Sequence, residues 1–122
     1  MRTKAIRVKD KEYLACFSTR VLVALEEKYG DADVGLSTVL SGGKVNDLFW
    51  LLAQLLEAGD RYAKQEGLEN PGALSLDDLL DRVGVDEYKD MFAGVAEAIR
   101  EGSGTTVDIE PEKNEEARQV AG

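Results

Sequence analysis

The sequence predicts a mainly α-helical fold: a small helical domain around a long central helix, with a short N-terminal β-hairpin and a flexible acidic C-terminal tail. Two prolines in 122 residues leave long stretches free to be helical. Apolar residues recur at helical spacing, and this spacing persists longest between residues 44 and 67. The length suits a single hydrophobic core. We therefore expect one domain over residues 1–101 and a tail over 102–122.

Two short β-prone runs open the chain, KAIRV at residues 4–8 and YLACF at residues 13–17. The polar tetrapeptide KDKE between them predicts a hairpin with a four-residue loop. Two strands alone are marginally stable, so the hairpin is expected to lean on helices. The single cysteine, Cys16, excludes an internal disulfide and is expected to be a small apolar strand residue.

A first helix is predicted over residues 19–30, with Gly30 as its stop signal. Its apolar face is expected to hold Val21, Leu22, Leu25 and Tyr29. The following segment, residues 31–43, predicts a packed connector with one or two helical turns before Gly42 and Gly43 break the chain.

The central helix is predicted from Lys44 to about Gly67, with one broad apolar stripe. The stripe comprises Val45, Leu48, Leu52, Leu55, Leu56, Gly59, Tyr62 and Ala63. The only tryptophan, Trp50, falls on the polar side, with Phe49 at an edge of the stripe and Ala53 one turn on.

Two interpretations of Trp50 remain open. In the first, the hairpin or the last helix covers it, and its indole N–H bonds to a carbonyl. In the second, Trp50 forms an apolar spot with Phe49 and Ala53 that serves self-association or grips a partner helix.

Beyond the central helix, residues 68–74 carry loop signals. Ser75 then stands at capping-box spacing from Asp78 and begins a short helix that ends at Gly84. Asp86 is expected to cap the last helix.

The tail from Gly102 is net negative and poor in apolar residues, so it is expected to be disordered or loosely attached. Its segment 105–109, TTVDI, is suited to adding an edge strand to the hairpin or a partner.

Composition argues against several function classes. With 24 Asp and Glu against 15 Lys and Arg, and no basic cluster, the chain is not expected to bind nucleic acid. No histidine is present to build the usual zinc sites or Ser/His and Cys/His pairs. Asp77, Asp78 and Asp81 lie in the first turns of a helix, where the helix dipole favours negative charge, so no metal is assigned to them. We expect no enzymatic activity and no cofactor.

Membrane insertion and export are not expected either. No segment reaches the about 18 to 20 uninterrupted apolar residues of a membrane span. The first residues also lack the apolar region of a secretion signal. The protein is therefore expected in the cytoplasm of the cell that makes it.

The order of these features resembles the tail assembly chaperones of long-tailed bacteriophages over roughly residues 13–101. The resemblance rests on two pieces of helix. The first helix contributes Leu25, Glu26, Glu27 and Gly30, and the central helix contributes Leu48, Trp50, Leu51 and Leu52.

This resemblance implies a non-enzymatic protein that coats the aggregation-prone tape-measure protein and helps the tail tube protein polymerise around it. It also implies the cytoplasm of the bacterial host as the location, and many members are made in a longer, frameshifted form. Self-association would suit binding along a rod-like client. Two alternatives remain: a structural virion component, such as a head-tail connector or tail completion protein, and a bacterial regulatory adaptor.

Overall fold

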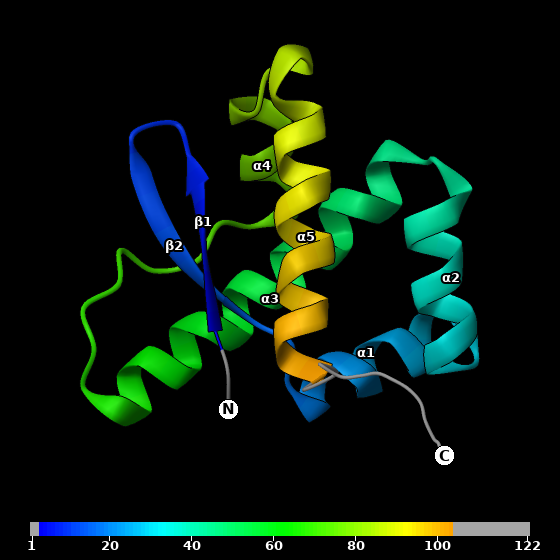
Figure 1. Cartoon of the computed structure of the whole chain (residues 1–122), viewed down its shortest axis with the longest axis horizontal. Coiled ribbons are helices and arrows are strands. Elements are labelled where there is room, and N and C mark those ends of the chain that lie inside the picture. Colours follow the sequence, from blue (N-terminus) through cyan, green and yellow to red (C-terminus); the bar gives the residue numbers. More distant parts are fainter. Residues whose placement is uncertain (1–2, 104–122) are drawn as a thin grey trace, which may run out of the picture.

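The computed structural model describes residues 3–103. It confirms the mainly helical fold with an N-terminal hairpin (Figure 1). The elements are β1 (Thr3–Val8), β2 (Lys11–Cys16), α1 (Thr19–Tyr29), α2 (Ala32–Gly42), α3 (Val45–Glu66), α4 (Leu76–Arg82), the 3-10 turn η1 (Val85–Glu87) and α5 (Tyr88–Ser103). Gly102 and Ser103 belong to α5, so the helix continues past the expected end of the domain. The rest of the expected tail, with its segment 105–109, lies outside the described residues.

The long helix α3 is the element around which the others pack (Figure 1). Its 22 residues span about 33 Å. It contacts β2 and the helices α1, α2, α4 and α5. The buried residues of α3 confirm most of the predicted stripe and extend it: Leu48, Phe49, Leu51, Leu52, Ala53, Leu55, Leu56, Ala58, Gly59 and Ala63.

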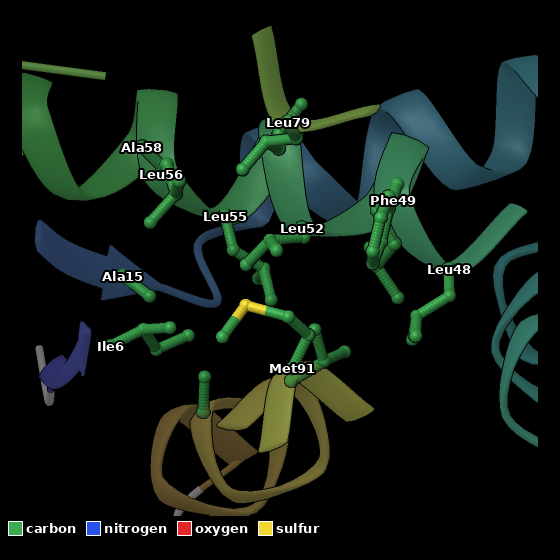
Figure 2. Packing of buried hydrophobic residues seen from close by; sticks show 14 of the residues in the cluster. Ile6, Ala15, Leu48, Phe49, Leu52, Leu55, Leu56, Ala58, Leu79 and Met91 are labelled. Atoms are coloured by element: carbon green, nitrogen blue, oxygen red, sulfur yellow. The ribbon is translucent and has the colours of Figure 1, made fainter. Parts of the chain in front are cut away.

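The core lies between α3, the hairpin and α5. Figure 2 shows Leu52 and Leu55 of α3 and Met91 of α5 pointing toward one another. The hairpin contributes five buried residues, Ile6, Val8, Tyr13, Ala15 and Cys16. At about 25 cal/mol for each Å² of apolar surface removed from water, this shared interior is the main stabilising contribution to the fold.

Two apolar residues expected in the core are exposed. Leu22 of α1 is 37% exposed and Val45 of α3 is 49% exposed. Leu22 lies about 100° around the helix from the buried Val21, and Val45 is the first residue of its helix. Helical spacing groups such edge residues with the stripe, although no neighbouring element covers them fully.

The hairpin loop is shorter than the sequence predicts. Val8 pairs with Lys11, so the loop contains two residues, Lys9 and Asp10, in place of four. Lys9 has a φ of 59°, the left-handed value that tight hairpins require at this point. Lys-Asp is not the usual pair for such a loop. The shorter loop lets Lys11 and Glu12 join the strand pairing, which satisfies further backbone groups.

The expected connector after α1 is a full helix, α2, of 11 residues. The Asp31 carboxylate accepts a hydrogen bond from the Val34 N–H at 3.0 Å and caps the first turn. Gly35 is buried within this helix, and the Tyr29 ring packs closely against it. This packing offsets the weak helix propensity of glycine. From the sequence alone, a glycine at this position argues against a helix.

The predicted N-terminal caps of α4 and α5 are confirmed only in part. The Ser75 hydroxyl accepts the Asp78 N–H at 3.1 Å and confirms the start of α4. Asp86 does not cap the last helix, because it lies within η1 and α5 begins at Tyr88. The Glu87 carboxylate accepts the Gly84 N–H at 2.7 Å, which caps the start of η1.

Glu87 also ties this corner to the hairpin. Its carboxylate lies 3.2 Å from the Lys9 ammonium in the hairpin loop. The Gly84 N–H, and after it Lys9, lower the pKa of Glu87. The turn before α5 is therefore held from both sides, by its own backbone and by the hairpin loop.

The central helix α3 approaches β2 very closely at Gly59. A side chain carbon at this position would overlap the Leu14 carbonyl group and lie 2.9 Å from the Ala15 nitrogen. Glycine removes that obstacle, so the helix and strand backbones meet directly. This contact sets the distance between the hairpin and the central helix.

Asn70, in the loop after α3, holds the same corner through hydrogen bonds. Its side-chain oxygen accepts the Leu14 N–H at 2.9 Å. Its amide donates to the Asp60 carboxylate at 3.0 Å and to the Gly72 carbonyl at 2.9 Å. Because the Leu14 N–H points away from β1, Asn70 satisfies a donor on the outer edge of the hairpin.

The substitution Gly59→Ala is expected to lower the free energy of unfolding by about 1–3 kcal/mol, since the new methyl group forces β2 away from α3. Urea denaturation followed by circular dichroism measures the change. Gly42→Ala is the matched control, because a Cβ there meets only the Thr38 methyl group, at 4.0 Å. It should be neutral or stabilising. A Gly59→Ala variant as stable as the parent would contradict the close approach.

The substitution Asn70→Ala is expected to cost about 1–3 kcal/mol at neutral pH, because the Leu14 N–H loses its acceptor. Asn46→Ala, at an exposed site on α3, is the control and should leave stability unchanged. An Asn70→Ala variant as stable as the parent would show that the hydrogen bonds of Asn70 do not contribute to stability.

The same variant should change the response of stability to acid. Asn70 first, and then Lys64, lower the pKa of Asp60 below its usual 3.8. A carboxylate with a lowered pKa stabilises the fold above the ordinary value, and this contribution is lost as pH falls through the lowered one. Removing Asn70 raises the Asp60 pKa toward 3.8, so Asn70→Ala should lose less stability than the parent below about pH 4. Denaturation at a series of pH values measures this difference.

Candidate partner-binding surface

Trp50 is half-buried and is covered from α1. Its ring meets the Tyr29 ring edge-on, with centroids 5.9 Å apart and planes at 82°. The Lys28 ammonium lies 5.1 Å from the centroid of the Trp50 ring. These contacts come from α1, whereas the first interpretation of Trp50 named the hairpin or the last helix as its cover.

Beside Trp50, the Tyr29 hydroxyl is buried. Within residues 3–103 this hydroxyl has no hydrogen-bond partner. Burial, and after it the nearby Asp47 carboxylate, raise the pKa of Tyr29 to about 12. Tyr29 is therefore neutral at physiological pH, and the cluster is held mainly by ring packing and the lysine cation.

The structure places the other two predicted contact residues inside the protein. Phe49 is 4% exposed and Ala53 is 6% exposed. Phe49 packs toward Tyr88 of α5, with ring centroids 6.2 Å apart, whereas Trp50 packs toward α1. Trp50, Phe49 and Ala53 thus do not form one exposed apolar patch, and their role in binding stays a prediction.

An apolar groove lies on the Phe49 side of α3. It has a volume of about 340 Å³ and is formed where the start of α3, the end of α4 and the turn before α5 meet. We call it the apolar groove; its lining residues are Val45, Phe49, Leu80, Val83, Gly84, Val85 and Tyr88.

The lining of the apolar groove combines a buried floor with exposed walls. Phe49, 4% exposed, belongs to the floor. Val85 is 96% exposed, Val45 49% and Leu80 40%. Three accessible aliphatic side chains around an aromatic floor form a site to which apolar side chains of another molecule can bind.

The sequence pattern does not predict this groove, although it places Val45 and Phe49 on the central helix. Val45 is assigned there to the central stripe, and Val85 to no apolar face. A usable signal exists in hindsight: Val85 is an isolated valine between Gly84 and Asp86, outside any amphipathic period. Only the fold brings it close to Val45 and Phe49, which precede it by about 40 residues.

The region that carries the groove is strongly acidic. Residues 76–90 hold six Asp or Glu against two Lys or Arg, a net charge of −4. The side-chain oxygen of Asp86 lies close to Gly84, a lining residue. Three basic residues also adjoin the lining in sequence, at Lys44, Arg82 and Lys89, so the charge next to the apolar walls is mixed.

Groups that support chemistry are sparse in the described residues. Residues 3–103 contain no cluster of three or more His, Cys, Asp or Glu placed to hold a metal ion. Cys16 is fully buried, and burial raises the pKa of its thiol. Within the same range, no helix has the length and apolar character needed to cross a membrane.

Comparisons of the chain with protein-family models, with curated proteins and with solved structures find no match. The likeness to phage tail assembly chaperones therefore rests on the helical sequence pattern alone.

Two neighbouring aromatic residues are expected to differ in their contribution to stability. Phe49→Ala should cost about 3–5 kcal/mol, as for a core aromatic residue. Trp50→Ala should cost less, about 2–3 kcal/mol, because this partly buried side chain loses its packing against the core, one edge-on ring contact and one cation over the ring. Urea denaturation measures both. An equal, large loss in Trp50→Ala would identify Trp50 as a core residue and remove it from the candidate contact surface.

Proposed function

We propose that the protein is a non-enzymatic assembly chaperone of a long-tailed bacteriophage. It binds and solubilises the tape-measure protein and assists polymerisation of the tail tube protein, in the cytoplasm of the bacterial host. The observation that carries this proposal is the apolar groove, which is open to solvent on a strongly acidic domain.

The groove supports binding of an apolar client. Exposed aliphatic residues that line a concavity typically mark an interaction site in a small soluble domain. A client that aggregates through apolar faces of its helices is kept in solution when those faces are covered. The net charge of −9 keeps the complex soluble, since like-charged complexes repel one another.

The sequence resemblance supplies the identity of the client. Tail assembly chaperones act on a long helical tape-measure protein, which needs many copies of a small binding protein along its length. Phe49 contributes to this contact as the floor of the groove. Trp50, with Lys28 beside it, provides a second, smaller surface for self-association along the client, and Ala53 supports α3 from within the core.

Co-expression with a candidate tape-measure protein tests the proposal. That protein is expected to be insoluble alone and to become soluble and co-purify when this chain is present. The control is co-expression with an unrelated acidic protein of similar size, which separates specific binding from a general charge effect. A client that stays insoluble would overturn the chaperone function.

Mass spectrometry of mature virions separates this function from a structural role. A chaperone leaves before the tail is complete, so this chain should be absent or far below stoichiometric amounts in finished particles. Its presence at a fixed copy number would favour the head-tail connector or tail completion alternative.

A further inference from the structure

We propose that the open edge of β1 binds residues 105–109 of the same chain, TTVDI, as a third strand that runs parallel to β1. Such pairing is independent of the proposed function and of the apolar groove. Four features support it: the direction of the main-chain groups of β1, a groove along this strand, the course of α5 and the side-chain pattern of the segment.

The two edges of the hairpin differ. The Leu14 N–H of β2 points outward to the Asn70 side chain, so Leu14 and the opposite Ala5 do not hydrogen-bond to each other. Alternation along β1 then turns the N–H and C=O groups of Thr3, Ala5 and Arg7 away from β2. Asn70 and α3 cover the outer edge of β2. Within residues 3–103, no hydrogen bond is made to the outward main-chain groups of Ala5 and Arg7.

A groove of about 350 Å³ runs along the open edge of β1, between this strand and α5 (Figure 1). Its lining includes Ala5 and Arg7, which point to solvent, and Ile6, which points to the core. A groove that touches both faces in the middle of a strand lies along the edge of that strand. On the helix side the lining includes Ala93 and Gly94, whose small size leaves room beside β1.

The helix α5 brings the chain to the start of this edge. Just before α5, the Glu87 carboxylate lies 3.2 Å from the Lys9 ammonium, at the far end of β1. Near the end of α5, the Glu97 carboxylate lies 3.0 Å from the Lys4 ammonium, at the start of β1. The helix therefore runs antiparallel to β1. A segment that follows α5 and turns back along the open edge runs parallel to β1.

The segment has the length and the side-chain pattern that this edge requires. At about 3.3 Å per residue, its five residues span about 16 Å, against about 20 Å for the six residues of β1. With residue 105 beside Lys4, Val107 lies beside Ile6 and Asp108 beside Arg7. Residues beside each other on neighbouring strands point to the same face, so Val107 joins the core side and Asp108 the solvent side.

The charges along the groove agree with this register. Within residues 3–103, Arg7 makes one ion pair, with the exposed Glu12 at 3.9 Å. Asp108 beside Arg7 gives the guanidinium a second carboxylate. Asp90, on the helix side of the groove, faces the threonine and valine side chains of the segment and meets no like charge.

The covalent connection favours this segment over a separate molecule. A segment joined to its site by a short linker is present at an effective concentration of about 1 mM. A second copy of this chain at micromolar concentration competes poorly with it, and the net charge of −9 on each copy opposes their approach. Covering the edge in this way also protects it from pairing with other chains.

Hydrogen exchange of the full chain, followed by NMR for each amide, tests the inference. The register directs the Val107 N–H to the Ala5 carbonyl, so Val107→Pro removes a hydrogen bond and disrupts the pairing. The amides of Ala5 and Arg7 should exchange at least about tenfold more slowly in the parent than in Val107→Pro. Val120→Pro, outside the segment, is the matched control and should match the parent. The Ile6 amide, bonded within the hairpin, should be unchanged in all three chains.

Equal exchange of the Ala5 and Arg7 amides in the parent and in Val107→Pro would overturn the inference. Slow exchange that appears only at high protein concentration would assign the edge to a second copy and overturn it as well.

A disulfide cross-link tests the register. The register places Ala5 and Thr106 side by side on the solvent face, within the distance that a disulfide spans. The variant Ala5→Cys with Thr106→Cys should form a disulfide within one chain under oxidised glutathione, whereas Cys16 is fully buried and should stay a thiol. Ala5→Cys with Gln119→Cys is the control. Mass spectrometry of proteolytic fragments measures both yields. Equal yields, or a disulfide formed only between two chains, would contradict the pairing.

Discussion

The direct contact between the backbones of α3 and β2 at Gly59 is the constraint on which the other packing depends. The central helix approaches the strand so closely that no side chain fits between them. Asn70 then fixes the strand edge from the loop that follows the helix. With β2 held in this position, the apolar side chains of the hairpin face α3 and α5 together, and one core forms.

A second glycine allows a close contact between α5 and the other strand of the hairpin. A side chain carbon at Gly94 of α5 would lie 3.3 Å from the Ile6 side chain of β1, so the helix also packs closely there. The hairpin is thereby held against α3 and α5, although two strands alone would be marginal. Glu87 and Lys9 add an ion pair between the hairpin loop and the turn before α5. That turn carries Val85, so the packing of the hairpin also positions one wall of the apolar groove.

The groove exists because the hairpin covers α3 near Gly59 and leaves the first residues of the helix to smaller elements. There α4, η1 and the start of α5 approach Phe49 but leave Val45, Leu80 and Val85 accessible. Phe49 and Trp50 are adjacent in sequence and about 100° apart around the helix. One therefore packs toward Tyr88 of α5 and the other toward Tyr29 of α1. The two candidate contact surfaces lie on different sides of one helix.

Local sequence signals determined most of the secondary structure. The leucines of α3 recur every three or four residues, and Ser75 stands three residues before Asp78, so the central helix and the start of α4 follow from spacing alone. The length of α2 and the two-residue hairpin loop did not follow, because Gly35 and Lys9 adopt conformations that packing and strand pairing stabilise. The position of the groove did not follow either. Periodicity states which side chains share a face of a helix, but only the tertiary structure decides which of those faces another element covers and which stay open.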